Sequence, residues 1–347
     1  MVSIRKALAI AVLCIPLFAD GSRADDLGVV ASIKPVHALV AGVMGETGNP
    51  ELLLTGAASP HAYQLRPSEA RALARADLIV WVGEDLETFL VDPITNLGSE
   101  AMIITLRGVP GMHLLPNREG GVWEGDDHDE DHGNGHDDHD RHEAEGGHEE
   151  HDDHDGHAEN DDHDENGDHD DHDHGEFDMH IWLDPENAGR IVDAVADALV
   201  RIDPDRAQTY RDNARMTRQR IESLHSDLAE QLSPVREQAF FVFHDAYQYF
   251  ERTYGLNGRG TIVIDPSRAP AVRRIMALRE ALLEHDVRCV FSEPQFSPDL
   301  VHTVVEGTNV RIATLDPIGA DIEPGPDAWF EIMQGLGDAV TECLGDV

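Results

Sequence analysis

The chain has 347 residues, which is more than one ordinary domain needs and predicts two. Its 68 acidic and 26 basic residues give a formal net charge of −42, which excludes nucleic acid and anionic membrane surfaces as default partners, because both bind basic patches. A hydrophobic content of 41% still allows sizeable cores.

Residues 1–24 are predicted to be a cleaved signal peptide. Arg5 and Lys6 precede an apolar run at 7–19, and small residues before and at Ala24 form a cleavage site. The run is too short for a membrane-spanning helix, which needs about 20 residues. We therefore expect export to an oxidising compartment.

The first half of the mature chain alternates strand and helix patterns. Apolar runs predict strands at 27–33, 52–54, 78–82 and 103–106, and Pro67 opens a helical pattern. Asp184 and Asp203, each followed by proline, predict two N-capped helices. The second, from 204 to about 232, would be about 40 Å long and could join two lobes.

The second half repeats the alternation. Strands are predicted at 240–243, 261–264, 288–291 and 311–315, and helices at 246–254, 272–283, 300–305 and 329–344. Parallel strands need helical crossovers, so the fold class is α/β with two small parallel-sheet lobes. The expected division is an N-terminal lobe at 25–203, a linking helix at 204–233 and a C-terminal lobe at 234–347.

Residues 124–178 form an acidic, histidine-rich insertion in the first lobe. They contain 27 carboxylates, 13 histidines and one basic residue, Arg141, with almost no apolar side chains. Such a composition cannot build a core and predicts a disordered segment.

Two cysteines, Cys289 and Cys343, remain after Cys14 leaves with the signal peptide. An even pair in an exported protein predicts a structural disulfide. Metal ligation is the alternative, but two distant cysteines in an oxidising space make a poor soft-metal site.

Three histidines outside the insertion are candidate metal ligands: His61, His180 and His244, at loop or strand-end positions. Ligands bind beyond the carboxyl ends of strands in open α/β sheets, so Asp316, which follows the last strand, is a fourth candidate. Three imidazoles with a carboxylate or water suit tetrahedral Zn²⁺. Glu293 ends a strand at the same edge, where a role in the cleft is one alternative and a solvated strand-end acid is the expectation.

Several short motifs resemble, in order, the periplasmic zinc-binding receptors of bacterial ABC importers, the ZnuA type. They are SIKPVH (32–37), ASPHAY (58–63), LRPS (65–68), HIWLDP (180–185), FHDAY (243–247), EPQF (293–296) and LDPIG (315–319). The resemblance covers nearly the whole mature chain outside the insertion, which itself resembles the histidine-rich loop of such receptors.

The resemblance implies two lobes joined by a long helix, with zinc held between them by His61, His180 and His244. Some family members use the aspartate matched by Asp316 as the fourth ligand, and others a glutamate before the first histidine. Here that position is Pro60, so the fourth ligand is Asp316 or water. Related manganese receptors have glutamate where this chain has His244, so nitrogen there favours zinc.

The resemblance further implies a non-enzymatic, monomeric periplasmic receptor that carries Zn²⁺ to an ABC permease driven by a cytoplasmic ATPase. The chain has no phosphate-binding GxxxxGK[ST] loop, so ATP hydrolysis would belong to partners. Two alternatives stay open. One is a zinc hydrolase or hydratase, because three histidines plus water is also a catalytic arrangement. The other is a zinc store or chaperone that acts through the insertion. In a receptor, the insertion itself has three alternative roles: it scavenges zinc for the cleft, it buffers or senses zinc, or it is only a solvated loop.

Overall fold

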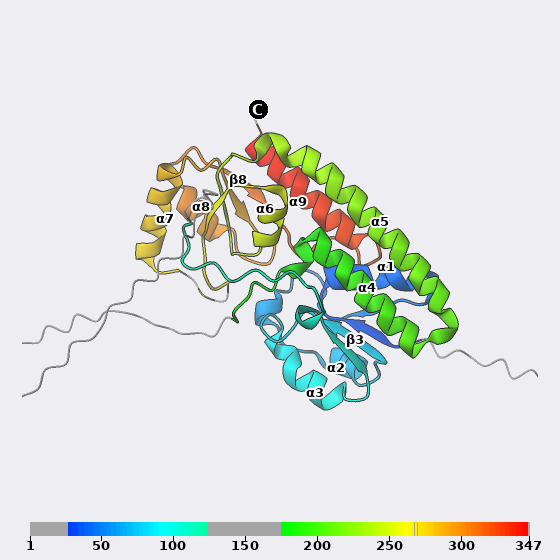
Figure 1. The fold of residues 1–347 in the computed structure, drawn as a ribbon. Helices are drawn as coiled ribbons and strands as arrows, with labels where there is room; N and C mark the ends of the chain where they lie inside the picture. The colour runs from blue at the N-terminus through cyan, green and yellow to red at the C-terminus, as the bar shows by residue number, and fades with distance from the viewer. Residues whose placement is uncertain (1–26, 124–174, 267, 269, 346–347) are drawn as a thin grey trace, which may run out of the picture.

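The computed structural model describes residues 27–123, 175–266, 268 and 270–345. The predicted signal peptide and residues 124–174 of the predicted insertion lie outside them. The described residues form two parallel four-stranded sheets, each covered by helices (Figure 1). The predicted fold class is thereby confirmed.

The N-terminal sheet has the strand order β2-β1-β3-β4 with every pair parallel. Its elements are β1 (Val29–Ala31), α1 (Lys34–Met44), β2 (Glu51–Leu52), α2 (Pro67–Leu73), β3 (Leu78–Trp81), α3 (Val91–Leu97) and β4 (Met102–Thr105). Strands β1 and β3 are completely buried. Continuous apolar runs such as LIVW in β3 produce this, because parallel strands are covered on both faces.

The C-terminal sheet repeats this topology with the order β6-β5-β7-β8, again all parallel. Its elements are β5 (Phe240–Val242), α6 (Gln248–Tyr254), β6 (Gly258–Thr261), α7 (Val272–Glu284), β7 (Cys289–Ser292), α8 (Asp299–Val305) and β8 (Arg311–Thr314). Each lobe therefore presents the carboxyl ends of four strands at one edge.

The strand predicted at 261–264 is displaced, because β6 occupies Gly258–Thr261 instead. The backbone of residues 121–123 pairs antiparallel with this strand: Thr261 donates its N–H to the Gly121 carbonyl, and Trp123 donates to the Arg259 carbonyl. A Cβ at Gly260 would lie 2.7 Å from the Gly121 oxygen, so glycine is required at this close approach.

Three helices connect the lobes: α4 (Pro185–Ile202), α5 (Ala207–Leu232) and α9 (Ala328–Leu344). Figure 1 shows α5 running the length of the molecule beside α4 and α9. Asp184 caps α4 as predicted, since its side chain accepts the Glu186 and Asn187 N–H groups. Asp203 lies at the predicted N-cap position, before the turn η6 (Pro204–Arg206), but side-chain capping there is wrong: its carboxylate instead accepts the Tyr210 hydroxyl at 2.6 Å and pairs with Arg206.

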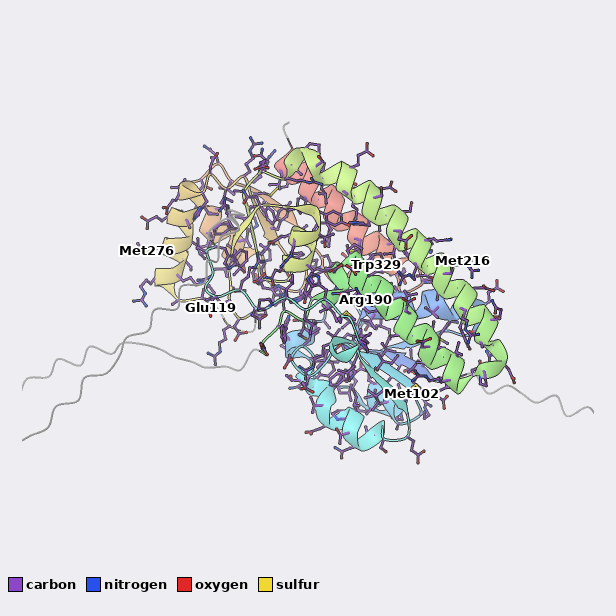
Figure 2. The ribbon with its side chains drawn as sticks, in the orientation of Figure 1. Met102, Glu119, Arg190, Met216, Met276 and Trp329 are labelled. Atoms are coloured by element: carbon purple, nitrogen blue, oxygen red, sulfur yellow. A yellow bond between two sulfur atoms is a disulfide. The ribbon has the colours of Figure 1, made fainter. Side chains whose placement is uncertain are left out.

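The lobes share a continuous apolar core beneath these helices. Trp329 is 1% exposed and lies inside the molecule, whereas Met216 and Met276 point outward (Figure 2). The Cys289 and Cys343 sulfurs form a disulfide between β7 and α9, with their Cα atoms 6.2 Å apart. None of the helices in the described part of the chain could cross a bilayer.

Candidate metal centre

Three histidines from separate segments converge between the lobes. His61 lies in a short 3₁₀ turn, η2 (Pro60–Ala62), where its N–H is accepted by the Ser59 hydroxyl. His180 precedes the turn η5 (Ile181–Leu183), and His244 follows strand β5. One ring nitrogen from each histidine lies within 4.8 Å of the others, and the ring centroids are 5.2–5.5 Å apart.

The spacing of His180 and His244 already matches a metal site. Their Nε2 atoms are 3.3 Å apart, and both rings are buried. Two nitrogens bound tetrahedrally to zinc at about 2.0–2.1 Å would be separated by about 3.3–3.4 Å. This pair could therefore bind zinc without moving.

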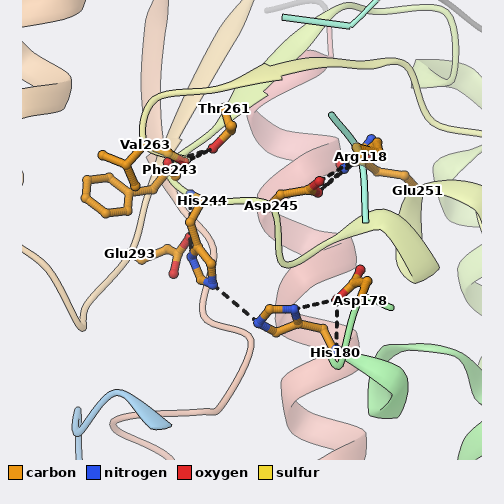
Figure 3. Close-up of polar contacts among 10 residues, drawn as sticks. All are labelled: Arg118, Asp178, His180, Phe243, His244, Asp245, Glu251, Thr261, Val263 and Glu293. Carbon is orange, nitrogen blue, oxygen red and sulfur yellow. Dashed lines mark hydrogen bonds and ion pairs between the residues drawn. The ribbon is translucent and has the colours of Figure 1, made fainter. Parts of the chain in front are cut away.

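A carboxylate orients each of these two rings (Figure 3). Asp178 Oδ1 lies 2.7 Å from Nδ1 of His180 and also accepts the His180 N–H. Glu293 Oε1 lies 2.7 Å from Nδ1 of His244. A proton on each Nδ1 leaves the Nε2 lone pair free, so both lone pairs point toward the same place.

The ionisation of the two rings is opposed. Burial lowers the pKa of His180 well below 6.5, and the neighbouring His244 lowers it further. Burial also disfavours the charged form of His244, but the carboxylates of Glu293, Asp245 and Asp178 together raise that pKa. Facing lone pairs repel each other unless a cation lies between them, and a dication could take that place.

The topology of the C-terminal sheet explains the position of His244 and Glu293. Strands β5 and β7 are neighbours, but β5 connects toward β6 and β7 connects toward β8. Ligands bind at such switch points, beyond the carboxyl ends of the strands. His244 follows β5 and Glu293 follows β7, so the sheet itself brings them together. The expectation that Glu293 is solvated is wrong, because its residue exposure is 3%.

Asp316 does not join the histidine cluster in the described residues. Its Oδ1 accepts the Gln295 amide at 2.8 Å and the N–H groups of Ile318 and Gly319, and its Oδ2 accepts the Ala320 N–H. Lys34 donates to the carbonyls of Gly319, Ala320 and Ile322 in the same loop. Both oxygens of Asp316 thus organise the loop after β8.

The space beside the imidazoles is small. The cavity has a volume of about 10 Å³, and its walls include Ser59, Trp182 and Phe296 besides the three histidines. That is about the volume needed to hold one water molecule. One ion or one water molecule could occupy this space.

One residue of this site, Asp178, escaped the sequence analysis. Asp178 falls inside the range predicted to be disordered, yet it is 4% exposed and bonds a candidate ligand. Its neighbour Phe177 pairs with Pro116, which returns the chain to the folded part. The signal was the apolar spacing of Phe177 and Met179, which the acidic composition obscured.

Comparison with known proteins identifies the family. The sequence matches the family described as "Zinc-uptake complex component A periplasmic" over residues 29–343. It is 43% identical over 317 residues to the high-affinity zinc uptake system protein ZnuA of Brucella abortus, covering 91% of each chain. It is 40% identical over 325 residues to that of Paracoccus denitrificans, covering 93% of this chain and 94% of the other.

Solved structures share the fold. One ZnuA crystal structure has a TM-score of 0.67 at 20% identity, covering 91% of this chain and all of the other. The periplasmic zinc-binding protein TroA from Treponema pallidum has a TM-score of 0.69 at 17% identity, covering 92% and 99%. At these identities the likeness concerns the fold alone.

Proposed function

We propose a function for this chain from one premise: it belongs to the ZnuA family of periplasmic components of zinc-uptake complexes. The protein captures Zn²⁺ between its two lobes and delivers it to a membrane permease. Zinc is the cargo of the protein and not a resident cofactor. The convergence of three imidazoles on one point carries this proposal.

His61, His180 and His244 hold the ion through one nitrogen each. The spacing of the two buried Nε2 atoms supports this assignment, as do the carboxylates that orient their rings. We assign the fourth position to water, because Asp316 does not join the histidine cluster of the described residues and its two oxygens already accept hydrogen bonds within the loop after β8. This choice between Asp316 and water goes beyond the family resemblance, which allows either.

The receptor role fits better than the hydrolase alternative. A hydrolase needs space for substrate beside the metal-bound water, and the cavity here has a volume of about 10 Å³. A receptor needs only to enclose an ion and release it. The protein is therefore not an enzyme in this proposal.

The remaining parts of the proposal follow from the family. An exported, monomeric receptor with a signal peptide cleaved after Ala24 would meet its permease at the membrane, and a cytoplasmic ATPase would drive transport. The N-terminal lobe at 25–203, the linking helix at 204–233 and the C-terminal lobe at 234–347 are the proposed units. The matching order of strands in the two sheets supports such a division.

The test is zinc titration of single histidine variants in competition with a chromophoric chelator. His61→Ala, His180→Ala and His244→Ala should each weaken the tight site by more than about 100-fold, because losing a direct ligand exceeds the 10–100-fold cost of losing an outer partner. His302→Ala is the matched control, because this histidine lies on helix α8 and should leave the affinity unchanged. Unchanged affinity in all three variants would remove the assignment.

Deleting residues 126–174 separates the receptor from the store. The receptor predicts that one tight equivalent of zinc persists, because the three ligands lie outside the deleted range. A store that acts through the insertion predicts complete loss of binding. Metal analysis of the purified deletion variant reports both the element and the number of equivalents.

A further inference from the structure

The segment that carries His180 is bonded to the C-terminal lobe. Tyr249, on helix α6, is 1% exposed. Its hydroxyl donates to the Asp178 carbonyl at 2.8 Å and accepts the Leu115 N–H at 3.0 Å. Asp178 in turn binds both the ring and the backbone of His180. The Tyr249 hydroxyl of the C-terminal lobe is therefore linked to the candidate ligand His180 through a single residue, Asp178.

Leu115 and Asp178 belong to two short antiparallel stretches, residues 115–118 and 175–178, which we name the paired segment. Asp178 donates its N–H to the Leu115 carbonyl at 2.9 Å, and Asn117 donates to the Glu176 carbonyl at 3.2 Å. These hydrogen bonds hold the two stretches of the paired segment together, and the Tyr249 hydroxyl bonds to both stretches.

Arg118 fastens the paired segment to the C-terminal lobe at a second point. Its guanidinium binds Asp245, the residue after His244, and donates to Glu251 of helix α6 at 2.6 Å (Figure 3). It also lies 3.5 Å from the ring centroid of Trp123. A cation that is bonded to two carboxylates and stacked on an indole holds the strand that carries it in place.

The chain after His180 is fastened to the same lobe. Trp182 donates its indole N–H to the Pro317 carbonyl at 2.8 Å, in the loop after β8. Trp329 of helix α9 donates to the Trp182 carbonyl at 2.9 Å. His180 is therefore held to the lobe of His244 both before and after its position in the sequence.

His61 has a different attachment. Its turn η2 lies between β2 and α2, so it is carried by the N-terminal sheet. A change in the distance between the lobes moves His61 relative to the other two histidines. The same change leaves His180 and His244 together.

We propose that His180 and His244 are a preassembled two-nitrogen pair, that Tyr249 is the positioning residue that fixes this pair, and that His61 is the ligand that closes the site. This inference rests on the proposed zinc-binding function and adds an order of assembly. A preassembled pair keeps a high effective concentration of its second nitrogen, so it binds metal without the third ligand. His61 paired with either other histidine has no such advantage.

The experiment is zinc titration of the full chain against a chromophoric chelator. The triple variant His61→Ala/His180→Ala/His244→Ala gives the baseline from zinc bound elsewhere. Above it, His61→Ala should bind zinc about 10-fold more tightly than His180→Ala or His244→Ala, because only His61→Ala keeps the pair. Equal affinities in the three single variants, or a His61→Ala variant as the weakest, would overturn the inference.

Tyr249→Phe tests the positioning role. It should lower zinc affinity about 10-fold, since outer partners of ligands contribute about 10–100-fold. When Tyr249→Phe is also present, His61→Ala should no longer bind zinc more tightly than His180→Ala or His244→Ala. The matched control is Tyr254→Phe, on the same helix and equally buried, whose hydroxyl lies 3.4 Å from His225 Nδ1 and not beside the paired segment. It should leave zinc affinity within about two-fold.

The outcomes separate the two proposals. Unchanged affinity in Tyr249→Phe would overturn the positioning role. Melting of the metal-free variants shows whether Tyr249→Phe folds, and the three alanine variants test the pair even where it does not. Equal zinc binding by the wild type and the triple variant would instead overturn the proposed function itself.

Discussion

The fourth ligand is open to a direct test through Asp316→Asn. The substitution keeps the size of the side chain and one acceptor oxygen, which can still accept from Gln295, Ile318 and Gly319. It places an NH₂ group where Oδ2 now accepts the Ala320 N–H. Two donors then face each other inside the loop after β8.

The expected magnitudes differ for the two roles of Asp316. If it organises the loop, an unpaired donor costs about 1–3 kcal/mol of unfolding free energy. That cost corresponds to roughly 2–12 °C of melting temperature, at about 2–4 °C per kcal/mol, the slope for chains of about 150–250 residues. Zinc affinity should change less than about 10-fold, since the three imidazoles and the water are retained.

Two measurements on the same variant give the answer. Thermal unfolding of the metal-free protein reports the loop, and chelator competition reports zinc. Ser297→Ala is a suitable control, because this hydroxyl bonds exposed Asp299 in the same lobe. A loss of zinc affinity above about 100-fold with an unchanged melting temperature would refute the reasoning and make Asp316 a direct ligand.

Zinc affinity should fall by up to about 10-fold per pH unit below the raised pKa of His244, because protons compete with zinc for Nε2, and a flat profile in calorimetry would contradict histidine ligation. The double variant Cys289→Ser/Cys343→Ser should lose about 4 kcal/mol in urea unfolding, since the disulfide spans 54 residues; a loss below about 1 kcal/mol would contradict this. Burial raises the pKa of the Glu87 carboxyl from 4.5 to about 7, so folding favours its protonated form. The resulting contribution to the free energy of unfolding is fully present below pH 4.5 and is lost as the pH rises to about 7. Glu87→Gln should flatten this dependence in thermal melts, and an unchanged slope would contradict it.

The fold could be predicted wherever strands alternate with amphipathic helices. Helix α7 begins at Val272 as expected, and β3 lies within the predicted apolar run. Helix α1 (Lys34–Met44) was missed because ten of its eleven residues are buried, which leaves no polar face and no helical period. Strand β6 was shifted because its two glycines weaken the strand pattern, and Gly260 is required by the close approach of the Gly121 backbone.

The candidate site, like the fold, has parts that could be predicted from the sequence and parts that could not. His61, His180 and His244 could be named because each follows a strand or begins a motif at a predictable edge. The roles of Asp178 and the paired segment, and the burial of Glu293 against His244, could not be predicted, because these partners depend on contacts across long separations. Glu293 meets His244 from 49 residues away, and Tyr249 meets Asp178 from 71 residues away. Such pairs follow from sheet order and loop path, which local patterns do not encode.

The charge that balances a bound zinc ion lies one bond beyond its proposed ligands. Three neutral imidazoles carry no charge, and the loop after β8 uses the carboxylate of Asp316. Asp178 and Glu293 bond the far nitrogens of His180 and His244. Burial raises the pKa of Asp178 to about 7, and a bound dication nearby would favour the charged forms of both carboxyls. Acting through a ring, they increase the basicity of nitrogen donors without adding an oxygen ligand, which hard cations prefer. The nitrogen donors therefore favour zinc over hard cations, while the outer carboxylates balance its charge, and the fourth position is left to an exchangeable water.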